Sequence, residues 1–454
     1  MRIKKLFLIL TSFMLVGVGS IVVNAECPDG LVSYWTFDDG TAADRVGSNH
    51  GVINGTITGI SGKVGQAFNL DGKTNYVSIN HSDSLDFDSE FTIEGWIKAN
   101  KENITKISVG INHGCALLDD GSIKCWGYNG NGQLGDGTNL IRYTPVSVLN
   151  INDAIDVSAG LAHSCAVLSD GSVNCWGSNN YGGLGDGTTN PSYVPVTVSG
   201  ITNSVAVESG RYYSCVLLDD HTIKCWGHNA YGQLGDGTTN DRYTPVSVSG
   251  INNAIILTVT DGSYPNSCAV LSDGHIKCWG RNAFGKLGAG TGDDSSIPVY
   301  VSGITDAIEV STGNTHTCAI LSDYSIKCWG YNVYGQLGDG SQTTRTTPVY
   351  VQGMNNGKKI AIGDYHTCAV LSDDTVKCWG YNNHGQLGDG TNTNRFTPTS
   401  VPNVINAVNI ASGAYYNCAL LNDGNIKCWG YNYRGQLGDG TIDFKKTTCF
   451  CFKH

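Results

Sequence analysis

Fourteen cysteines recur as seven pairs, with the two thiols of each pair ten residues apart. Such pairs can form disulfides, pack as buried thiols, or bind a metal. Zinc is disfavoured, because two thiolates on one hairpin fill only half of its tetrahedral shell. We expect disulfides, on the argument for a secreted chain given below, and Cys27, Cys449 and Cys451 are left over. The pairs are Cys115 and Cys125, Cys165 and Cys175, Cys215 and Cys225, Cys268 and Cys278, Cys318 and Cys328, Cys368 and Cys378, and Cys418 and Cys428.

Histidines recur with the same spacing. His113, His163, His316 and His366 stand two residues before the first cysteine of their copies, where the other copies have Tyr213, Asn266 and Tyr416. A repeat spreads equivalent residues apart instead of gathering them into one site. We therefore interpret the histidines as structural groups that hydrogen-bond to backbone.

Aspartates recur in Gly-Asp-Gly segments, at Asp136, Asp186, Asp236, Asp339, Asp389 and Asp439. One carboxylate per loop is too few for calcium, so we expect each to cap an Asx-type turn. The chain has no nucleophile elbow, phosphate-binding loop or His-Glu-x-x-His motif. The sequence thus predicts no catalytic residue, no metal site and no cofactor, and we expect a protein that is not an enzyme.

The residues between two paired cysteines predict a hairpin. In the second copy, Ser169, Asp170 and Gly171 fit a three-residue loop with the glycine in the left-handed region. That loop sets Leu168 opposite Ser172 and Cys165 opposite Cys175, close enough for a disulfide. In three copies the glycine is replaced, by His221, Tyr324 and Asp374, and tyrosine fits positive φ poorly.

The seven copies follow one another every 50 residues, except for one step of 53 between the third and the fourth. Each copy contains four short runs typical of β-strands, which in the second copy are 154–160, 164–168, 172–177 and 193–198. Seven units of four strands indicate a seven-bladed β-propeller, which protects its sheet edges by radial repetition. A linear β-solenoid is the alternative, although its coils are usually shorter.

Each copy repeats one pattern of cysteines, a histidine position, a hairpin glycine position and a Gly-Asp-Gly position, as described above. This pattern resembles the regulator of chromosome condensation repeat, and the resemblance covers residues 104–448. It implies an all-β, seven-bladed propeller. Two copies depart from the pattern. The fourth has an insertion near 263–265, with Lys286 and Ala289 at the usual Gln and Asp positions. The seventh lacks its Pro-Val strand and ends in an atypical tail, 449–454, which puts closure of the ring in question. In the second copy the matching residues are Gly160, His163, Asp170, Gly171, Trp176, Gly177, Asn179, Gly182, Leu184 and Gly185.

A second resemblance precedes the repeats. Residues 30–40, 62–79 and 91–100 are similar to the opening of a laminin-G-like, concanavalin-type jelly roll. Only about half of such a domain fits into 26–100, and half a β-sandwich leaves one inner face uncovered. The predicted fold is therefore a propeller preceded by a partial β-sandwich.

Residues 1–25 have a basic start, an apolar run and small residues before Glu26, as in a secretory signal peptide. We expect a secreted or cell-surface protein, and an uncleaved anchor is the alternative and the one expected link to a membrane. The formal charge is −11 and no basic stretch follows the leader. Nucleic acid and the small GTPases bound by nuclear members of the resembled family are therefore not expected as partners.

The loops that follow each Cys-Trp-Gly vary between copies, as do those before the histidine position. A constant framework with changing loops is typical of binding scaffolds, and Tyr and Arg are enriched at binding sites. The aromatic residues can instead pack between blades. We expect a non-catalytic recognition protein whose partner is an extracellular protein or glycan. By fold analogy alone, the alternative is a secreted inhibitor of an extracellular enzyme. The candidate binding residues are Tyr128, Tyr181, Tyr212, Tyr231, Phe284, Tyr334, Tyr365, Tyr415 and Arg434.

Overall fold

The computed structural model describes residues 41–45, 48–54, 58–61, 66–69, 76–79 and 103–452. The chain forms two compact units, 1–100 and 101–454. In the first unit, β1 (Gly51–Asn54) pairs with β4 (Tyr76–Ile79), and β2 (Thr58–Ser61) pairs with β3 (Gln66–Asn69), both antiparallel. The predicted signal peptide lies outside the described residues, as do Cys27 and most of the predicted jelly roll. The signal peptide and the jelly roll therefore stay predictions. No helix in the described parts is long and apolar enough to cross a bilayer.

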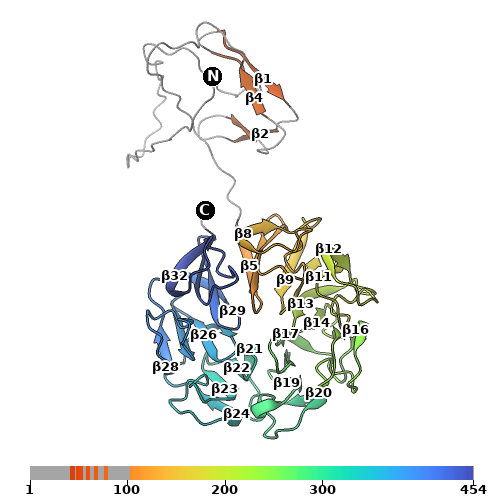
Figure 1. Ribbon diagram of the computed structural model, residues 1–454, viewed down its shortest axis with the longest axis vertical. Helices are drawn as coiled ribbons and strands as arrows, with labels where there is room; N and C mark the ends of the chain where they lie inside the picture. The colour runs from red at the N-terminus through yellow and green to blue at the C-terminus, as the bar shows by residue number, and fades with distance from the viewer. Residues whose placement is uncertain are drawn as a thin grey trace. The chain divides into compact units, whose positions relative to one another are not determined.

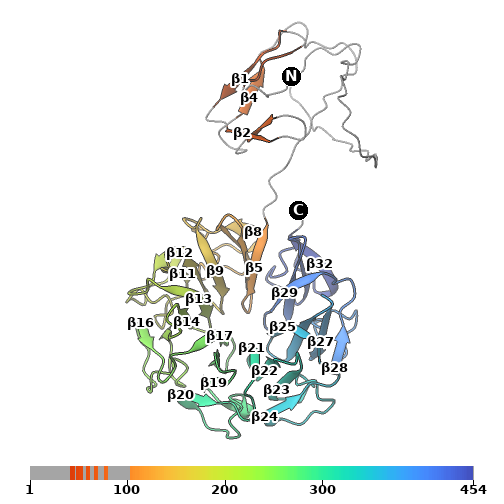
Figure 2. The ribbon, with the colours of Figure 1, turned by 180° about the vertical axis from the view of Figure 1, so that it is seen from behind.

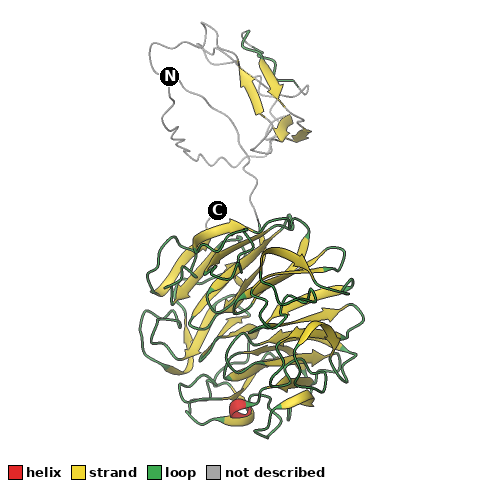
Figure 3. Ribbon diagram, turned by 45° about the vertical axis from the view of Figure 1, so that its right-hand side comes forward, coloured by secondary structure: helices red, strands yellow, loops and turns green. Residues whose placement is uncertain are grey.

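The second unit is a ring of seven four-stranded antiparallel sheets (Figures 1 and 2). Within residues 103–452 the one helical turn is η2 (Ala283–Gly285), drawn red in Figure 3. In each blade the first strand lies nearest the centre of the ring and the fourth lies outermost (Figure 1). The all-β propeller predicted from the repeat is therefore confirmed.

The blades follow chain order. Blade 1 is β5 (Ile104–Val109), β6 (His113–Leu118), β7 (Ile123–Gly127) and β8 (Arg142–Ser147). Blade 2 is β9 (Ala154–Ala159), β10 (His163–Leu168), β11 (Val173–Gly177) and β12 (Ser192–Thr197). Blade 3 is β13 (Ser204–Ser209), β14 (Tyr213–Leu218), β15 (Ile223–Gly227) and β16 (Arg242–Ser247). Blade 4 is β17 (Ala254–Val259), β18 (Asn266–Leu271), β19 (Ile276–Gly280) and β20 (Ser295–Tyr300).

The last three blades repeat this order. Blade 5 is β21 (Ala307–Thr312), β22 (His316–Leu321), β23 (Ile326–Gly330) and β24 (Arg345–Tyr350). Blade 6 is β25 (Gly357–Ile362), β26 (His366–Leu371), β27 (Val376–Gly380) and β28 (Arg395–Ser400). Blade 7 is β29 (Ala407–Ser412), β30 (Tyr416–Leu421), β31 (Ile426–Gly430) and β32 (Lys445–Phe452).

The hairpin between the second and third strands has the predicted register. Leu168 N donates to Ser172 O at 2.9 Å, and Gly171 N donates to Leu168 O at 2.9 Å. Gly171 has a φ of 78°, so the three-residue loop with a left-handed third position is confirmed. The residues that replace this glycine adopt the same conformation, with φ of 65° at His221, 64° at Tyr324 and 60° at Asp374.

The register places Cys165 opposite Cys175, and all seven cysteine pairs form disulfides. All fourteen of these cysteines are fully buried. They belong to the apolar clusters that join each blade to the next. Between blades 1 and 2, for example, the Cys115–Cys125 bridge packs with Leu117 and with Trp176 of the second blade.

The seventh blade is complete, and the expectation of a missing fourth strand was wrong. Residues Lys445–Phe452 form β32, which pairs with β31 and sets Cys449 opposite Cys428. Strand pairing uses backbone groups, so a segment without the Pro-Val pattern can form the ladder if its inward positions are apolar. Cys451 is 8% exposed within the cluster between blades 7 and 1, whereas Phe450 is 42% exposed. Cys449 and Cys451 are free thiols.

Candidate binding face

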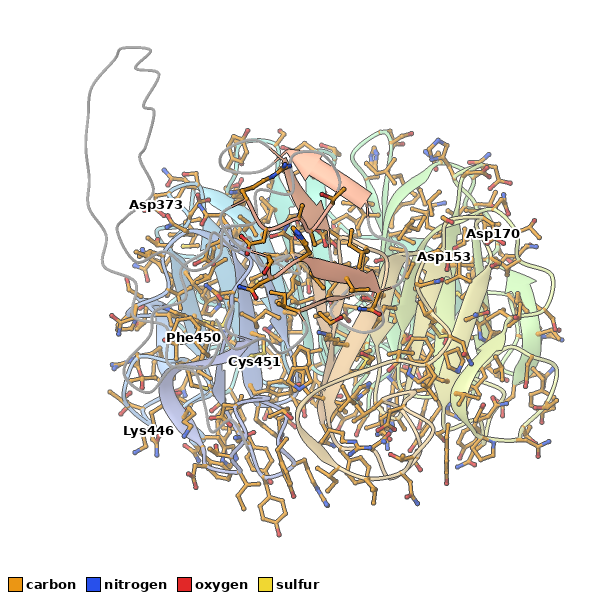
Figure 4. All side chains as sticks on the ribbon, turned by 90° about the horizontal axis from the view of Figure 1, so that it is seen from above. Asp153, Asp170, Asp373, Lys446, Phe450 and Cys451 are labelled. Atoms are coloured by element: carbon orange, nitrogen blue, oxygen red, sulfur yellow. A yellow bond between two sulfur atoms is a disulfide. The ribbon has the colours of Figure 1, made fainter. Side chains whose placement is uncertain are left out.

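Strand direction divides the loops between the two faces of the ring. In blade 2, the loop between the first two strands, 160–162, and the loop between the last two, 178–191, lie on one face, here called the loop face. The hairpin turn at 169–172 and the link to blade 3 lie on the opposite turn face. In the edge-on view of Figure 4, Asp153 and Asp170 mark the turn face and Lys446 lies toward the loop face. All nine predicted binding residues belong to loops of the loop face.

A buried asparagine holds each loop that follows Cys-Trp-Gly. In blade 1, Asn129 Oδ1 accepts a hydrogen bond from Leu134 N at 3.0 Å, and Asn129 Nδ2 donates to Thr138 O at 3.0 Å. The contact to the leucine N–H is present in every blade. The loop is thus fixed at its base while the residues at its tip differ between blades. The equivalent residues are Asn179, Asn229, Asn282, Asn332, Asn382 and Asn432.

The Gly-Asp-Gly aspartates act as predicted. Asp136 Oδ1 accepts from Thr138 N at 3.0 Å and from Thr138 Oγ1 at 2.8 Å, as in an Asx turn. Asp136 has a second partner that was not predicted, Arg142 at the start of β8, whose guanidinium nitrogen lies 2.7 Å from Asp136 Oδ2. Arg242, Arg345 and Arg395 form the same ion pair in blades 3, 5 and 6. These carboxylates are committed to loop structure.

The histidines join neighbouring blades. His163 Nε2 lies 2.8 Å from Ser214 Oγ of blade 3. The Ser214 hydroxyl donates to Gly183 O at 2.9 Å, so we assign the shared hydrogen to the imidazole Nε2. Burial lowers the pKa of His163 to about 4, and the ring is therefore neutral at physiological pH. His113, His316 and His366 make the equivalent contacts to Ser164, Thr367 and Asn417.

The histidines are structural, as predicted, but the expected backbone partner was wrong. The next blade offers a side chain instead, which its own bond to a loop carbonyl holds in place. Among the described residues no group of three or more His, Cys, Asp or Glu side chains is arranged to hold a metal. The groups presented on the loop face are aromatic rings, guanidinium groups and carboxylates, which suit non-covalent binding.

Ring contacts run without interruption across the loop face of blades 4 to 7. We call this set the aromatic band. Centroids of successive rings lie between 4.6 and 6.3 Å apart, as in favourable aromatic pairs. Phe284 and Phe444 are 38% and 46% exposed, and the other rings are half-buried. The band comprises Tyr264, Phe284, Tyr331, Tyr334, Tyr365, Tyr381, His384, Tyr415, Tyr431 and Phe444.

The rings of the aromatic band pack between neighbouring blades and also face solvent. Tyr334 of blade 5 contacts Tyr381 of blade 6 with centroids 4.8 Å apart, and both rings keep part of their surface exposed. Four predicted residues belong to the band: Phe284, Tyr334, Tyr365 and Tyr415. Tyr331, Tyr381 and Tyr431 were not predicted, although each of them directly follows Cys-Trp-Gly in one of three successive copies, a signal that is visible in the sequence.

The other predicted residues form two separate groups. The centroids of the Tyr181 and Tyr212 rings lie 5.2 Å apart, and Tyr231 lines the same hollow, whose volume is about 370 Å³. Arg434 lies 5.0 Å from the centroid of the Tyr128 ring, where blade 7 meets blade 1. No described ring contact joins Tyr128 to Tyr181, so the structure distributes the nine residues over three groups.

Two carboxylates lie among the inner loops. Burial raises the pKa of Asp261 and of Asp364 to about 7, and the Asp261 charge adds to the shift at Asp364 while Lys286 and Arg211 oppose it. Neither residue was predicted to be functional. Both therefore change charge close to neutral pH.

Known families match the described ring. The family model of the RCC1-like domain matches residues 70–319. Models of the regulator of chromosome condensation (RCC1) repeat match 307–336, 358–386 and 407–436, and also 328–370 and 373–420.

Solved structures share the fold at low identity. Human WBSCR16 has a TM-score of 0.65 and 21% identity, over 72% of this chain and 94% of that one. Yeast RCC1 (Prp20), solved with Kap60, has a TM-score of 0.64 and 18% identity, over 81% and 91%. The structure of Prp20p from Saccharomyces cerevisiae gives 0.63 and 20%, over 78% and 88%. A domain model that matches more than half of the chain and seven blades that carry the repeat establish that this chain belongs to the RCC1-like domain family.

Proposed function

We propose that this protein is a non-catalytic recognition protein that acts outside the cell or at its surface and binds a protein or glycan through its loop face. The aromatic band is the observation that carries the proposal. Continuous, half-exposed tyrosine rings offer large contact area at a small entropic cost and combine an apolar face with a hydroxyl. The recurring asparagine contacts hold the loops that follow Cys-Trp-Gly, which carry most of these rings.

The disulfides support a location outside the cytoplasm. Seven local bridges persist in oxidising compartments and are rare where thiols are kept reduced. The predicted leader at 1–25 agrees with that location. The yeast protein is bound to Kap60 in one of its structures, and the other is described together with its binding properties to Gsp1p and histones. We propose a different partner here, because the leader and the bridges suit an extracellular environment.

The recurring polar groups are engaged in structural contacts, which supports the proposal that the protein is not catalytic. The histidines are buried and neutral between blades, and the Gly-Asp-Gly carboxylates accept hydrogen bonds within their own loops. None of these groups is free to act as a general acid, a general base or a nucleophile at the loop face.

The test adds purified protein to whole cells and envelope fractions pretreated with protease or with periodate. Loss of binding after periodate alone supports a glycan, and loss after protease alone supports a protein. A stable one-to-one complex with a single secreted enzyme would favour the inhibitor alternative.

The variant Tyr334→Ser with Tyr381→Ser tests the aromatic band. Tyr350→Ser is the matched control, because Tyr350 is 60% exposed at the turn-face end of β24. Binding that survives the double variant, or that Tyr350→Ser abolishes equally, would contradict the proposal.

A further inference from the structure

The hollow of about 370 Å³ lies between blades 2, 3 and 4 and shares Tyr264 with the aromatic band. Tyr181 comes from blade 2, Tyr212 and Tyr231 from blade 3, and Tyr264 from blade 4. Arg211 and Arg281 also line the hollow, and we call this site the arginine pocket. Its size falls within the range of small-molecule sites.

The copy that departs from the repeat builds one wall of this pocket. The insertion in the fourth copy brings Tyr264 to the rim, and two buried groups fix its backbone. Tyr264 N donates to Asn314 Oδ1 at 3.0 Å. Lys286 Nζ donates to Tyr264 O and also to Gly313 O and Asn314 O, both at 3.1 Å. Lys286 stands where five copies have glutamine, and its ammonium group supplies the donors that hold the backbone of this wall.

Arg281 is held between two rings with donors to spare. Its Cζ lies 4.3 Å from the centroid of the Tyr231 ring and 4.5 Å from that of Tyr264. Of its five N–H donors, one is engaged by Ser263 O at 3.3 Å. Arg211 lies 5.7 Å from the centroid of Tyr212. Within residues 103–452 neither guanidinium is placed within 4 Å of a carboxylate.

His228 adds a neutral donor. Its Nδ1 lies 3.0 Å from Gln233 Nε2, an amide nitrogen that can only donate, so we assign the ring hydrogen to Nε2. The imidazole lies 4.6 Å from the Tyr181 ring at the edge of the pocket. Burial lowers the pKa of His228, which keeps the ring neutral at physiological pH.

We infer that the arginine pocket binds a carboxylate-bearing sugar residue, such as a uronic or sialic acid at the end of a glycan. The two guanidinium groups that line the pocket suit a carboxylate, which accepts two parallel N–H bonds from one arginine. The tyrosine rings suit the flat C–H face of a pyranose, which the side chain of an acidic peptide does not offer. Because the chain carries a formal charge of −11, attraction of an anion must come from these local groups. The inference rests on the proposed function and names its ligand.

The test measures binding to a panel of oligosaccharides that end in a uronic or a sialic acid, each beside its carboxyl-reduced counterpart, and to a hexaglutamate peptide. We expect at least one acidic glycan to bind about tenfold or more tightly than its reduced counterpart, as loss of charge-assisted hydrogen bonds implies. Equal binding of the two forms, or binding of the peptide alone, would overturn the inference.

Two variants locate the site without disturbing the fold. Arg281→Tyr introduces the residue found at this position in four other copies, and Arg211→Leu introduces the residue of blade 2, Leu161. Both variants should bind the acidic glycan about tenfold more weakly than the parent protein, and their melting temperatures should be unchanged. Lys327→Met is the control, since Lys327 also lies over a tyrosine ring, that of Tyr350, but at the turn-face end of its blade and outside the pocket.

Failure of the inference is distinguishable from failure of the proposed function. If no acidic glycan binds while the protein still binds envelope material through the aromatic band, the ligand inference alone is wrong. If the protein binds neither envelope material nor any member of the panel, the proposed function fails as well.

Discussion

Trp126 Nε1 donates a 2.9 Å hydrogen bond to Gln436 O, across 310 residues of chain. The same bond joins every other pair of neighbouring blades, for example Trp176 to Gln133 O at 2.9 Å. Blades 7 and 1 also share an apolar cluster that contains Trp126 and Cys451. The ring is therefore closed by the contacts that hold its other interfaces together.

The closing interface should be the most sensitive to loss of its indole. In blade 2, Ser164 Oγ also donates to Gln133 O, whereas Gly114 stands at the equivalent position of blade 1. Trp126→Phe thus leaves the Gln436 carbonyl without its donor, and we expect it to destabilise the fold by about 1–2 kcal/mol more than Trp176→Phe. Urea midpoints of the two variants under non-reducing conditions test this. Equal losses would show that the closing bond has no special weight.

Removing one bridge should cost stability without changing the fold. Cys165→Ala with Cys175→Ala deletes a disulfide that closes a short hairpin, and we expect a loss of about 2–3 kcal/mol. The thermal midpoint of the double variant measures it. Alkylation without reduction, followed by peptide mapping, provides the control, because none of the fourteen bridged cysteines should be labelled.

Acid should act through the buried histidines. The pKa of His163 is lowered to about 4 in the folded state, so as pH falls below 6.5 the unfolded chain binds a proton that the folded chain excludes. Stability is lost over that interval, by about 2 kcal/mol per such histidine at pH 5. His163→Gln removes this term, and the stability gap between parent and variant should shrink by that amount from pH 7.5 to pH 5. Parallel stability curves would contradict the assignment.

Restoring the repeat residue at position 286 should harm the protein. Five copies carry glutamine there, so Lys286→Gln looks like a correction toward the repeat. The lysine donates to three carbonyls, including that of Tyr264, and a glutamine side chain cannot replace them all. We expect a loss of about 1–3 kcal/mol in the unfolding free energy, measured by denaturant titration. A stabilised variant would show that the contacts of the lysine are dispensable.

The turn at Tyr324 should gain from glycine. Tyr324 adopts a φ of 64° in the hairpin of blade 5, where four other copies have glycine. A left-handed conformation costs a residue with a Cβ about 1–2 kcal/mol, a cost that glycine avoids. Glycine also loses more conformational entropy on folding, which offsets part of this gain. Tyr324→Gly should therefore raise the thermal midpoint slightly. His221→Gly is the comparison, and its gain should be smaller because His221 Nδ1 contacts Ala254 O at 3.1 Å.

The sequence by itself determined the number of blades, the hairpin register and the cysteine pairing. Each of these depends on residues close together in the chain, and the loop at 169–171 alone decides which thiol faces which. The same local signals identified which loops vary. Period-2 alternation at Cys449, Phe450 and Cys451 also indicated a strand, but the missing Pro-Val pattern concealed it.

The tertiary structure decided which loop residues meet. Curvature of the ring brings Tyr334 of one blade against Tyr381 of the next, 47 positions later in the chain, and leaves Tyr128 apart from Tyr181. Contacts between blades also set the partners of the histidines and of Lys286, since those partners come from another repeat. Such pairings depend on the packing of whole sheets, which no spacing within a single copy encodes.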